Sequence, residues 1–197
     1  ITSNPMDKIK NEEKPKRRRT ERAFLTIDEL KILSQTDFHN ATLKKAFLFS
    51  CFCGLRHSDI VALTWGNLKK GKVGKMELHM TQQKTQEILS LPLSKEALKQ
   101  LPVRGKVPDT EKVFKGLISL GRTNEILPKW AAKAGIQKHI TFHSARHTHA
   151  TMMITLGADL YTVSKLLGHT NIQTTQIYAK IVDESKEKAI DLIPDIT

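Results

Sequence analysis

The sequence has few of the residues that stabilise small secreted or zinc-binding domains. It contains 2 cysteines among 197 residues. Cys51 and Cys53 lie one residue apart, which is too close for an ordinary disulfide, and two cysteines are too few for a structural zinc site. We therefore expect buried free thiols in a reducing compartment. Aromatic residues make up 6% of the chain, which argues against a surface built on stacked bases or sugars.

Long apolar runs are also missing. No window of the sequence approaches the roughly 18 continuous apolar residues of a membrane span, and the N-terminus lacks the apolar core of a signal peptide. The length suits one packed domain with tails rather than two domains. We expect a cytoplasmic protein with no membrane partner.

Acidic residues are scarce relative to basic ones. The chain has 32 Lys+Arg against 20 Asp+Glu, a net charge of +12. Clustered cations gain affinity for phosphates by releasing condensed counterions, so this charge predicts a nucleic-acid partner. Residues 1–22 carry eight cations and four anions with almost nothing to bury, which is typical of a linker or arm. Because Met first occurs at position 6, we expect the chain to come from a longer protein whose missing part lies upstream.

The apolar periodicity predicts a mainly α fold with a small antiparallel β-sheet, an α+β class. Thr26 and Glu29 form a capping box at the first helix, and Gly54 ends the second. A short helix is expected in "RHSDIVALTW". Further helices are predicted to open at Ser94, to lie in "DTEKVFKGL" (109–117), to run over 123–134, from "TFHSARHTHA" to Gly157 and over 159–167, and to form a final pair with Tyr178 and then "DESKEKAIDLI".

Between these helices the period changes from 3.6 to 2. Met76, Leu78 and Met80 alternate with polar residues, and a partner run of alternating leucines spans 89–93. This pattern predicts a β-hairpin. The connecting turn "TQQKTQ" places Lys84 near its tip.

Two local features allow alternative interpretations, a zinc site and a helix-turn-helix. His143 and His147 have the i, i+4 spacing of a helical zinc pair, but no glutamate follows His143 and no third ligand is apparent. The segment "LGADLYTVSKLLG" is typical of the turn and recognition helix of a helix-turn-helix. That reading makes the protein a non-catalytic basic DNA-binding module. It explains the charge but not Arg56 or Lys84.

In chain order, a series of polar residues falls at the expected breaks between elements. The motifs are "CGLRHSDI", "QQKTQ", "HSAR", "LLGHT" and "TTQIYAKI", and the residues are Arg56, Lys84, His143, Arg146, His169 and Tyr178. Over residues 24–182 the series resembles the catalytic domain of tyrosine recombinases, the phage integrase family, and is most like integrases of conjugative transposons. Type IB topoisomerases share the chemistry but lack the "HSAR" histidine pattern in this form. Cys53 stands where the family usually has Thr or Ser.

The resemblance implies metal-free and cofactor-free DNA cleavage and rejoining through a 3′-phosphotyrosyl intermediate. Tyr178 would attack the phosphorus, and a guanidinium such as Arg56 or Arg146 can hold two phosphate oxygens while staying charged. A neutral tyrosine must lose its proton to become a good nucleophile. We assign that proton to His143, because it shares a helix face with Arg146. Tyr161 is the rival nucleophile, but it precedes the "LGH" turn.

The remaining residues have supporting roles in this scheme. Lys84 would be the general acid for the departing 5′-oxygen, and His169 would donate a hydrogen bond to a non-bridging oxygen. Asp59, three residues after Arg56, either orients that arginine or is an ordinary solvated carboxylate. His147 is read as a supporting or structural residue and His149 as part of the core.

The resemblance also divides the chain and implies its partners. We expect a basic arm at 1–22, the catalytic domain at 23–182 and a C-terminal helical tail at 183–197, packed on its own domain or exchanged between protomers. The implied partners are double-stranded DNA, further protomers in a tetrameric synapse, and accessory DNA-bending or directionality proteins, in a bacterial cytoplasm at the nucleoid. The resemblance implies an N-terminal core-binding domain that we expect to lie outside this piece, so we expect the piece alone to bind DNA weakly. Integration is favoured over inversion or dimer resolution.

Overall fold

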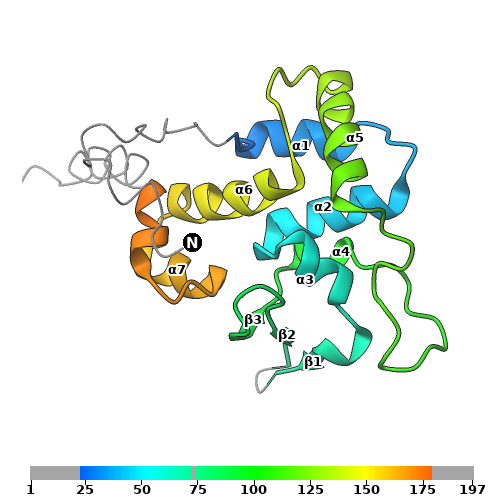
Figure 1. The fold of residues 1–197 in the computed structure, drawn as a ribbon, viewed down its shortest axis with the longest axis vertical. Coiled ribbons are helices and arrows are strands. Elements are labelled where there is room, and N and C mark those ends of the chain that lie inside the picture. Colours follow the sequence, from blue (N-terminus) through cyan, green and yellow to red (C-terminus); the bar gives the residue numbers. More distant parts are fainter. Residues whose placement is uncertain (1–22, 72–73, 179–197) are drawn as a thin grey trace, which may run out of the picture.

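The computed structural model describes residues 23–71 and 74–178, and one small sheet lies at one end of its group of helices (Figure 1). The α-helices are α1 (Ile27–Gln35), α2 (Ala41–Cys53), α3 (His57–Ala62), α4 (Lys95–Lys99), α5 (Leu120–Lys133), α6 (Phe142–Thr155) and α7 (Leu160–Leu167). The strands β1 (Leu68–Lys70), β2 (Met76–Thr81) and β3 (Ile88–Pro92) form an antiparallel sheet in that order. Three short 3-10 helices complete the fold: η2 (Trp65–Asn67), η3 (Ile172–Thr174) and η4 (Gln176–Tyr178). The predicted mainly α fold with a small antiparallel sheet is confirmed.

The core is built around α2 and α6, which pack side by side (Figure 1). Both helices are buried on most of their surface, as expected of helices that lack a continuous polar face. Phe47 of α2 packs edge-on against Phe142 of α6 and Trp130 of α5. Cys51 and Cys53 are free buried thiols, as predicted, and burial raises the pKa of Cys53 to about 12.

The predicted helix ends are largely confirmed. Thr26 and Glu29 form the capping box of α1, and Gly54 and Gly168 end α2 and α7 in the left-handed conformation, with φ of 72° and 64°. α5 begins at Leu120, three residues before the predicted start, because the hydroxyl of Ser119 accepts from the backbone N–H of Arg122. Capping chemistry next to a break in periodicity was therefore sufficient to place most of the helices.

The helix predicted at residues 109–117 is wrong. This segment forms turns and a bridge between Thr64 and Lys112, because its backbone pairs with the chain after α3. Trp65 N–H donates to Glu111 O, and Val113 N–H donates to Leu63 O. Val113 and Phe114 are both buried although they are adjacent. Long-range pairing here overrides the local helical pattern.

The hairpin is confirmed. Leu78 pairs with Leu91 and Met80 with Leu89, and the side chains of these four residues are buried. Strand β1 was not predicted, because three residues are too short to show an alternating pattern. The sheet lies beside α3, on the opposite side of the molecule from α1 and α5 (Figure 1).

His149 on α6 is part of the core, as predicted. Its Nδ1–H donates to the Cys51 carbonyl of α2. Its ring also lies so close to Gly54 that a Cβ there would approach Cδ2 to 2.9 Å. Burial, with a smaller effect of the Arg146 charge, lowers the pKa of His149 to about 4.

We predict that acid destabilises the protein through His149. Its folded pKa lies below the ordinary value, so the unfolded chain binds the proton more readily, and stability is lost as pH falls from about 6.5 towards 4. Between about pH 7 and pH 5, this histidine accounts for about 2 kcal/mol of lost unfolding free energy. Urea unfolding should show that His149→Gln lacks this part of the drop, whereas the exposed control His139→Gln retains it. An equal drop in wild type and His149→Gln would contradict the assignment.

Candidate active site

Arg146 lies at the junction of three helices. It is buried on α6, its Nη1 donates to Gly54 O and its Nη2 donates to Leu167 O, each at 2.7 Å. These carbonyls lie at the C-terminal ends of α2 and α7, where backbone acceptors lack helical partners and the helix dipole is negative. Two helix ends therefore hold one guanidinium in a fixed orientation.

Arg56 lies near enough to Arg146 for their charges to interact. Burial and repulsion from Arg56 together lower the pKa of Arg146 to about 10, against the opposing effects of Tyr178 and Asp59. Arg146 therefore stays protonated at neutral pH. Two cations held together in a partly buried region form a site suited to an anion with several oxygens.

Asp59 supports Arg56 from inside the fold. The carboxylate is fully buried; Oδ2 accepts from the Arg56 backbone N–H at 3.2 Å and lies 3.9 Å from its Nη1. Oδ1 accepts from the Gln83 backbone N–H at 2.8 Å. Within residues 23–71 and 74–178, Arg56 Nη1 is buried without a hydrogen-bond partner, a state that buried donors rarely keep. Asp59 thus contacts both the backbone and the guanidinium region of Arg56, a geometry that can hold this arginine in one orientation.

Lys84 lies in the turn between β2 and β3 and is exposed. The turn is closed by two backbone hydrogen bonds, from Gln82 N–H to Glu87 O and from Gln86 N–H to Gln82 O. Because Gln83 is bonded to Asp59, the turn is attached to the element that carries Arg56. These hydrogen bonds therefore hold the backbone of Lys84 in a fixed position relative to Arg56.

His169 follows Gly168 at the end of α7, and its Nδ1 hydrogen bonds with the Thr175 hydroxyl at 2.8 Å. Burial, followed by the charges of Arg146 and Arg56 and the effect of His143, lowers the pKa of His169 to about 4. The imidazole is therefore neutral at neutral pH. It can accept from Thr175 with one nitrogen and donate to an anion with the other.

Tyr178 is buried beside α6. Its hydroxyl hydrogen bonds with His147 Nδ1 at 2.6 Å, and its ring packs in a small cluster with Ala150, Ile154 and Leu167. The ring of His143 meets the ring of His147 edge-on, with centroids 4.6 Å apart. The sequence assigned the tyrosine proton to His143 and gave His147 a supporting role, but the structure places His147 directly on the hydroxyl.

The rival tyrosine has a different environment. Tyr161 is 60% exposed on α7, and its ring lies near the Lys165 ammonium at 5.2 Å from the ring centroid. Val163, Ser164 and Leu167 form the buried face of α7. In the described part of the chain, the inward face of α7 therefore packs into the core, and its last residue supplies the carbonyl that accepts from Arg146.

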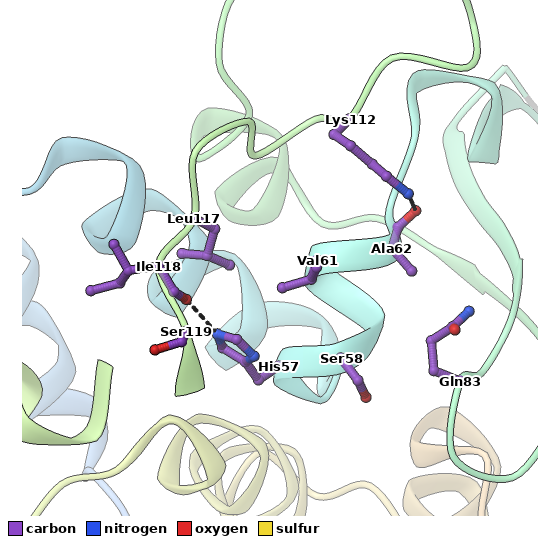
Figure 2. A pocket seen from close by; sticks show the side chains of 9 residues that line it. All are labelled: His57, Ser58, Val61, Ala62, Gln83, Lys112, Leu117, Ile118 and Ser119. Carbon is purple, nitrogen blue, oxygen red and sulfur yellow. Dashed lines mark hydrogen bonds between the residues drawn. The ribbon is translucent and has the colours of Figure 1, made fainter. Parts of the chain in front are cut away.

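A pocket beside α3 is a second candidate site, and Figure 2 shows the side chains around it. Two of its polar groups are already used within the fold: His57 Nε2 hydrogen bonds with Ile118 O at 3.1 Å, and Lys112 Nζ donates to Ala62 O at 2.9 Å (Figure 2). Arg146, His169 and Tyr178 do not line the pocket. The pocket is therefore distinct from the site around Arg146. Gln83 links the two, because it lines the pocket and its backbone N–H donates to Asp59.

The described ranges 23–71 and 74–178 contain neither a metal-binding cluster nor a membrane-spanning helix. No group of three or more His, Cys, Asp or Glu side chains there is arranged to hold a metal ion, so the pair His143 and His147 gains no third ligand from these residues. No helix in these ranges is long and apolar enough to cross a membrane. The basic arm at 1–22 and the tail at 183–197 lie outside the described residues.

Comparison with solved structures agrees with this geometry. XerA recombinase superposes with a TM-score of 0.68 at 20% identity, covering 85% of this chain and 65% of its own. The catalytic domain of bacteriophage HP1 integrase gives 0.63 at 22% identity, covering 88% and 96%. The Tn1549 transposon integrase in complex with circular intermediate DNA gives 0.61 at 20% identity, covering 85% and 67%. The fold is therefore that of tyrosine recombinase catalytic domains.

Sequence comparison gives the family. The phage integrase family profile matches residues 23–185. A tyrosine recombinase of Pseudothermotoga lettingae is 30% identical over 192 residues, which cover 95% of this chain and 65% of that protein. The chain belongs to the phage integrase family, and it spans about two thirds of the length of this relative.

Proposed function

We propose that this chain is the catalytic part of a site-specific tyrosine recombinase. The observation that carries the proposal is the placement of two consecutive residues of α6: Arg146 belongs to the paired-arginine site and His147 holds the hydroxyl of Tyr178. A nucleophile and a charge-stabilising site on one helix are what phosphoryl transfer through a protein side chain requires.

The cleavage step follows from these positions. The Tyr178 oxygen forms a bond to phosphorus as the bond from phosphorus to the 5′-oxygen breaks. His147 takes the tyrosine proton, and Lys84 supplies the proton that the leaving 5′-hydroxyl gains. The reverse step lets a 5′-hydroxyl reseal the strand, because the phosphotyrosyl bond conserves the energy of the phosphodiester.

The cationic residues act on the transition state. Arg56 and Arg146 hold the non-bridging oxygens, where negative charge must be balanced during in-line transfer. Neutral His169, oriented by Thr175, donates a hydrogen bond to one of them. His143 is close enough to His169 to affect its pKa, so we place it beside the phosphate.

The partners and the biological role are proposed on the same basis. The charge of +12 favours double-stranded DNA, and one structural neighbour is a transposon integrase bound to circular intermediate DNA. We propose that the chain acts with further protomers in the integration of a conjugative element, on DNA in the bacterial cytoplasm. Accessory bending or directionality proteins belong to that proposal.

The test is covalent capture from a pool of nicked DNA duplexes with a randomised core. A nick next to the scissile phosphate releases a short strand after cleavage, so rejoining fails and the adduct accumulates. We expect protein–DNA adducts that resist detergent, and their sequencing gives the substrate for the other assays. A non-catalytic DNA-binding module would instead select sequences without any adduct, and that outcome would overturn the proposal.

A further inference from the structure

Gln82 is a buried polar residue in the hairpin turn, directly after the end of β2. It continues the inward series of Leu78 and Met80 and is fully buried. Its Nε2 donates to Leu167 O at 3.2 Å, and its Oε1 accepts from the Thr85 hydroxyl at 2.9 Å. A buried amide with two partners is costly to misplace, because each unsatisfied group loses its hydration without compensation.

The amide also packs against the turn that carries His169. A Cβ at Gly168 would lie 2.8 Å from Gln82 Oε1, so the glycine allows this contact as well as its left-handed conformation. The carbonyl of Leu167 is shared, because it accepts from both Gln82 Nε2 and Arg146 Nη2. Gln82 therefore joins the hairpin turn to the acceptor that orients Arg146.

The next residue is joined to the other arginine. Gln83 N–H donates to Asp59 Oδ1, while Asp59 Oδ2 accepts from the Arg56 backbone. Gln82 is thus bonded to the carbonyl that holds Arg146, and Gln83 to the carboxylate that contacts Arg56. Lys84 is the next residue in the chain. Backbone hydrogen bonds across the turn, from Gln82 to Glu87 and from Gln86 to Gln82, transmit this anchoring to Lys84.

We propose that Gln82 is a positioning residue for Lys84: its amide fixes the hairpin turn on Leu167 O, so that the ammonium reaches the leaving 5′-oxygen. This inference rests on the proposed function, in which Lys84 is the general acid. Gln82 takes no part in the chemical step itself: Lys84 gives one proton to the 5′-oxygen as the phosphotyrosyl bond forms. Without the anchor, Arg56 and Arg146 keep their other contacts but proton delivery becomes slow.

The test compares the captured DNA as a nicked substrate with a twin in which sulfur replaces the bridging 5′-oxygen. A thiolate leaves without a proton because thiols have much lower pKa values than alcohols. Gln82→Met keeps the volume and removes both hydrogen bonds. We expect it to slow adduct formation on the oxygen substrate about 10-fold to 100-fold and to approach the wild-type rate on the sulfur substrate. Gln137→Met, the same change at an exposed position, should match wild type on both.

A second variant covers the case in which Gln82→Met does not fold. Thr85→Val removes the hydroxyl that orients the Gln82 amide and should show a smaller loss with the same rescue by sulfur. Equal slowing of both substrates by these variants, or no slowing, overturns the inference. Lys84→Ala tests the proposed function separately. If sulfur fails to rescue Lys84→Ala, the general-acid assignment itself is wrong. If sulfur rescues Lys84→Ala but not the Gln82 and Thr85 variants, only the role of Gln82 is wrong.

Discussion

Replacing Tyr178 with Phe is expected to lower covalent adduct formation by a factor of about a thousand or more, because the variant lacks the attacking oxygen. The ring should keep its place in the cluster with Ala150, Ile154 and Leu167, so folding should be retained. His147→Gln belongs to the same prediction: its amide can still hydrogen bond with the hydroxyl but cannot take its proton, and about 100-fold slower adduct formation is expected.

Tyr161→Phe is the matched control for this prediction, because Tyr161 is the exposed tyrosine on α7. Its adduct yield on the captured nicked substrate should equal that of wild type. An adduct formed by Tyr178→Phe, measured by denaturing gel electrophoresis, would show that another residue is the nucleophile. An unchanged rate for His147→Gln would show that another group accepts the tyrosine proton, and His143 would be the next candidate.

Arg146→Lys is expected to lower the rate of adduct formation by about 100-fold to 1,000-fold although the positive charge is conserved. Arg146 makes two hydrogen bonds to carbonyls on different helices while its charge acts beside Arg56. A lysine ammonium is a single point of charge and cannot reach both carbonyls and a phosphate oxygen together. A lysine that bonds to Leu167 O leaves Gly54 O without the donor that Arg146 supplies, and one that bonds to Gly54 O leaves Leu167 O with Gln82 Nε2 alone.

The same variant should be less stable, because a buried acceptor left without a donor costs about 1 to 3 kcal/mol. Adduct rates must accordingly be compared at a temperature where urea unfolding shows both proteins folded. Arg122→Lys is the control, since Arg122 is exposed and pairs with Glu125 on the surface of α5. Adduct formation by Arg146→Lys at a rate within about fivefold of wild type would contradict the two-arginine site, since such a site requires the larger loss.

Residue patterns near the site identified its parts but not all of their contacts. The motif series named both arginines, and the structure adds that helix ends orient Arg146 and that buried Asp59 supports Arg56. Gln82 was missed, although a signal existed: it is a polar residue in register with the inward side chains of β2. A polar residue at an inward position predicts a buried hydrogen-bonded role, and here that role lies next to Lys84.

The failed helix at 109–117 has the same physical origin as the missed contacts. Its local pattern was compatible with a helix, but its backbone forms hydrogen bonds with Leu63 and Trp65 instead. Local patterns report the preferences of neighbouring residues and cannot report such pairing. Capping boxes, glycine helix ends and the alternation of the hairpin depend on nearby residues, which is why those predictions succeeded.

The sequence by itself determined the α+β class, most helix ends, the hairpin with Lys84 and the ordered motif series of the phage integrase family. The tertiary structure decided which groups meet: the hydroxyl of Tyr178 with His147, 31 residues away, and the amide of Gln82 with Leu167 O, 85 residues away. It also made one carbonyl the acceptor for both Arg146 and the hairpin. Periodicity and capping act over one or two helical turns, whereas hydrogen bonds between distant elements form only when packing brings their ends together.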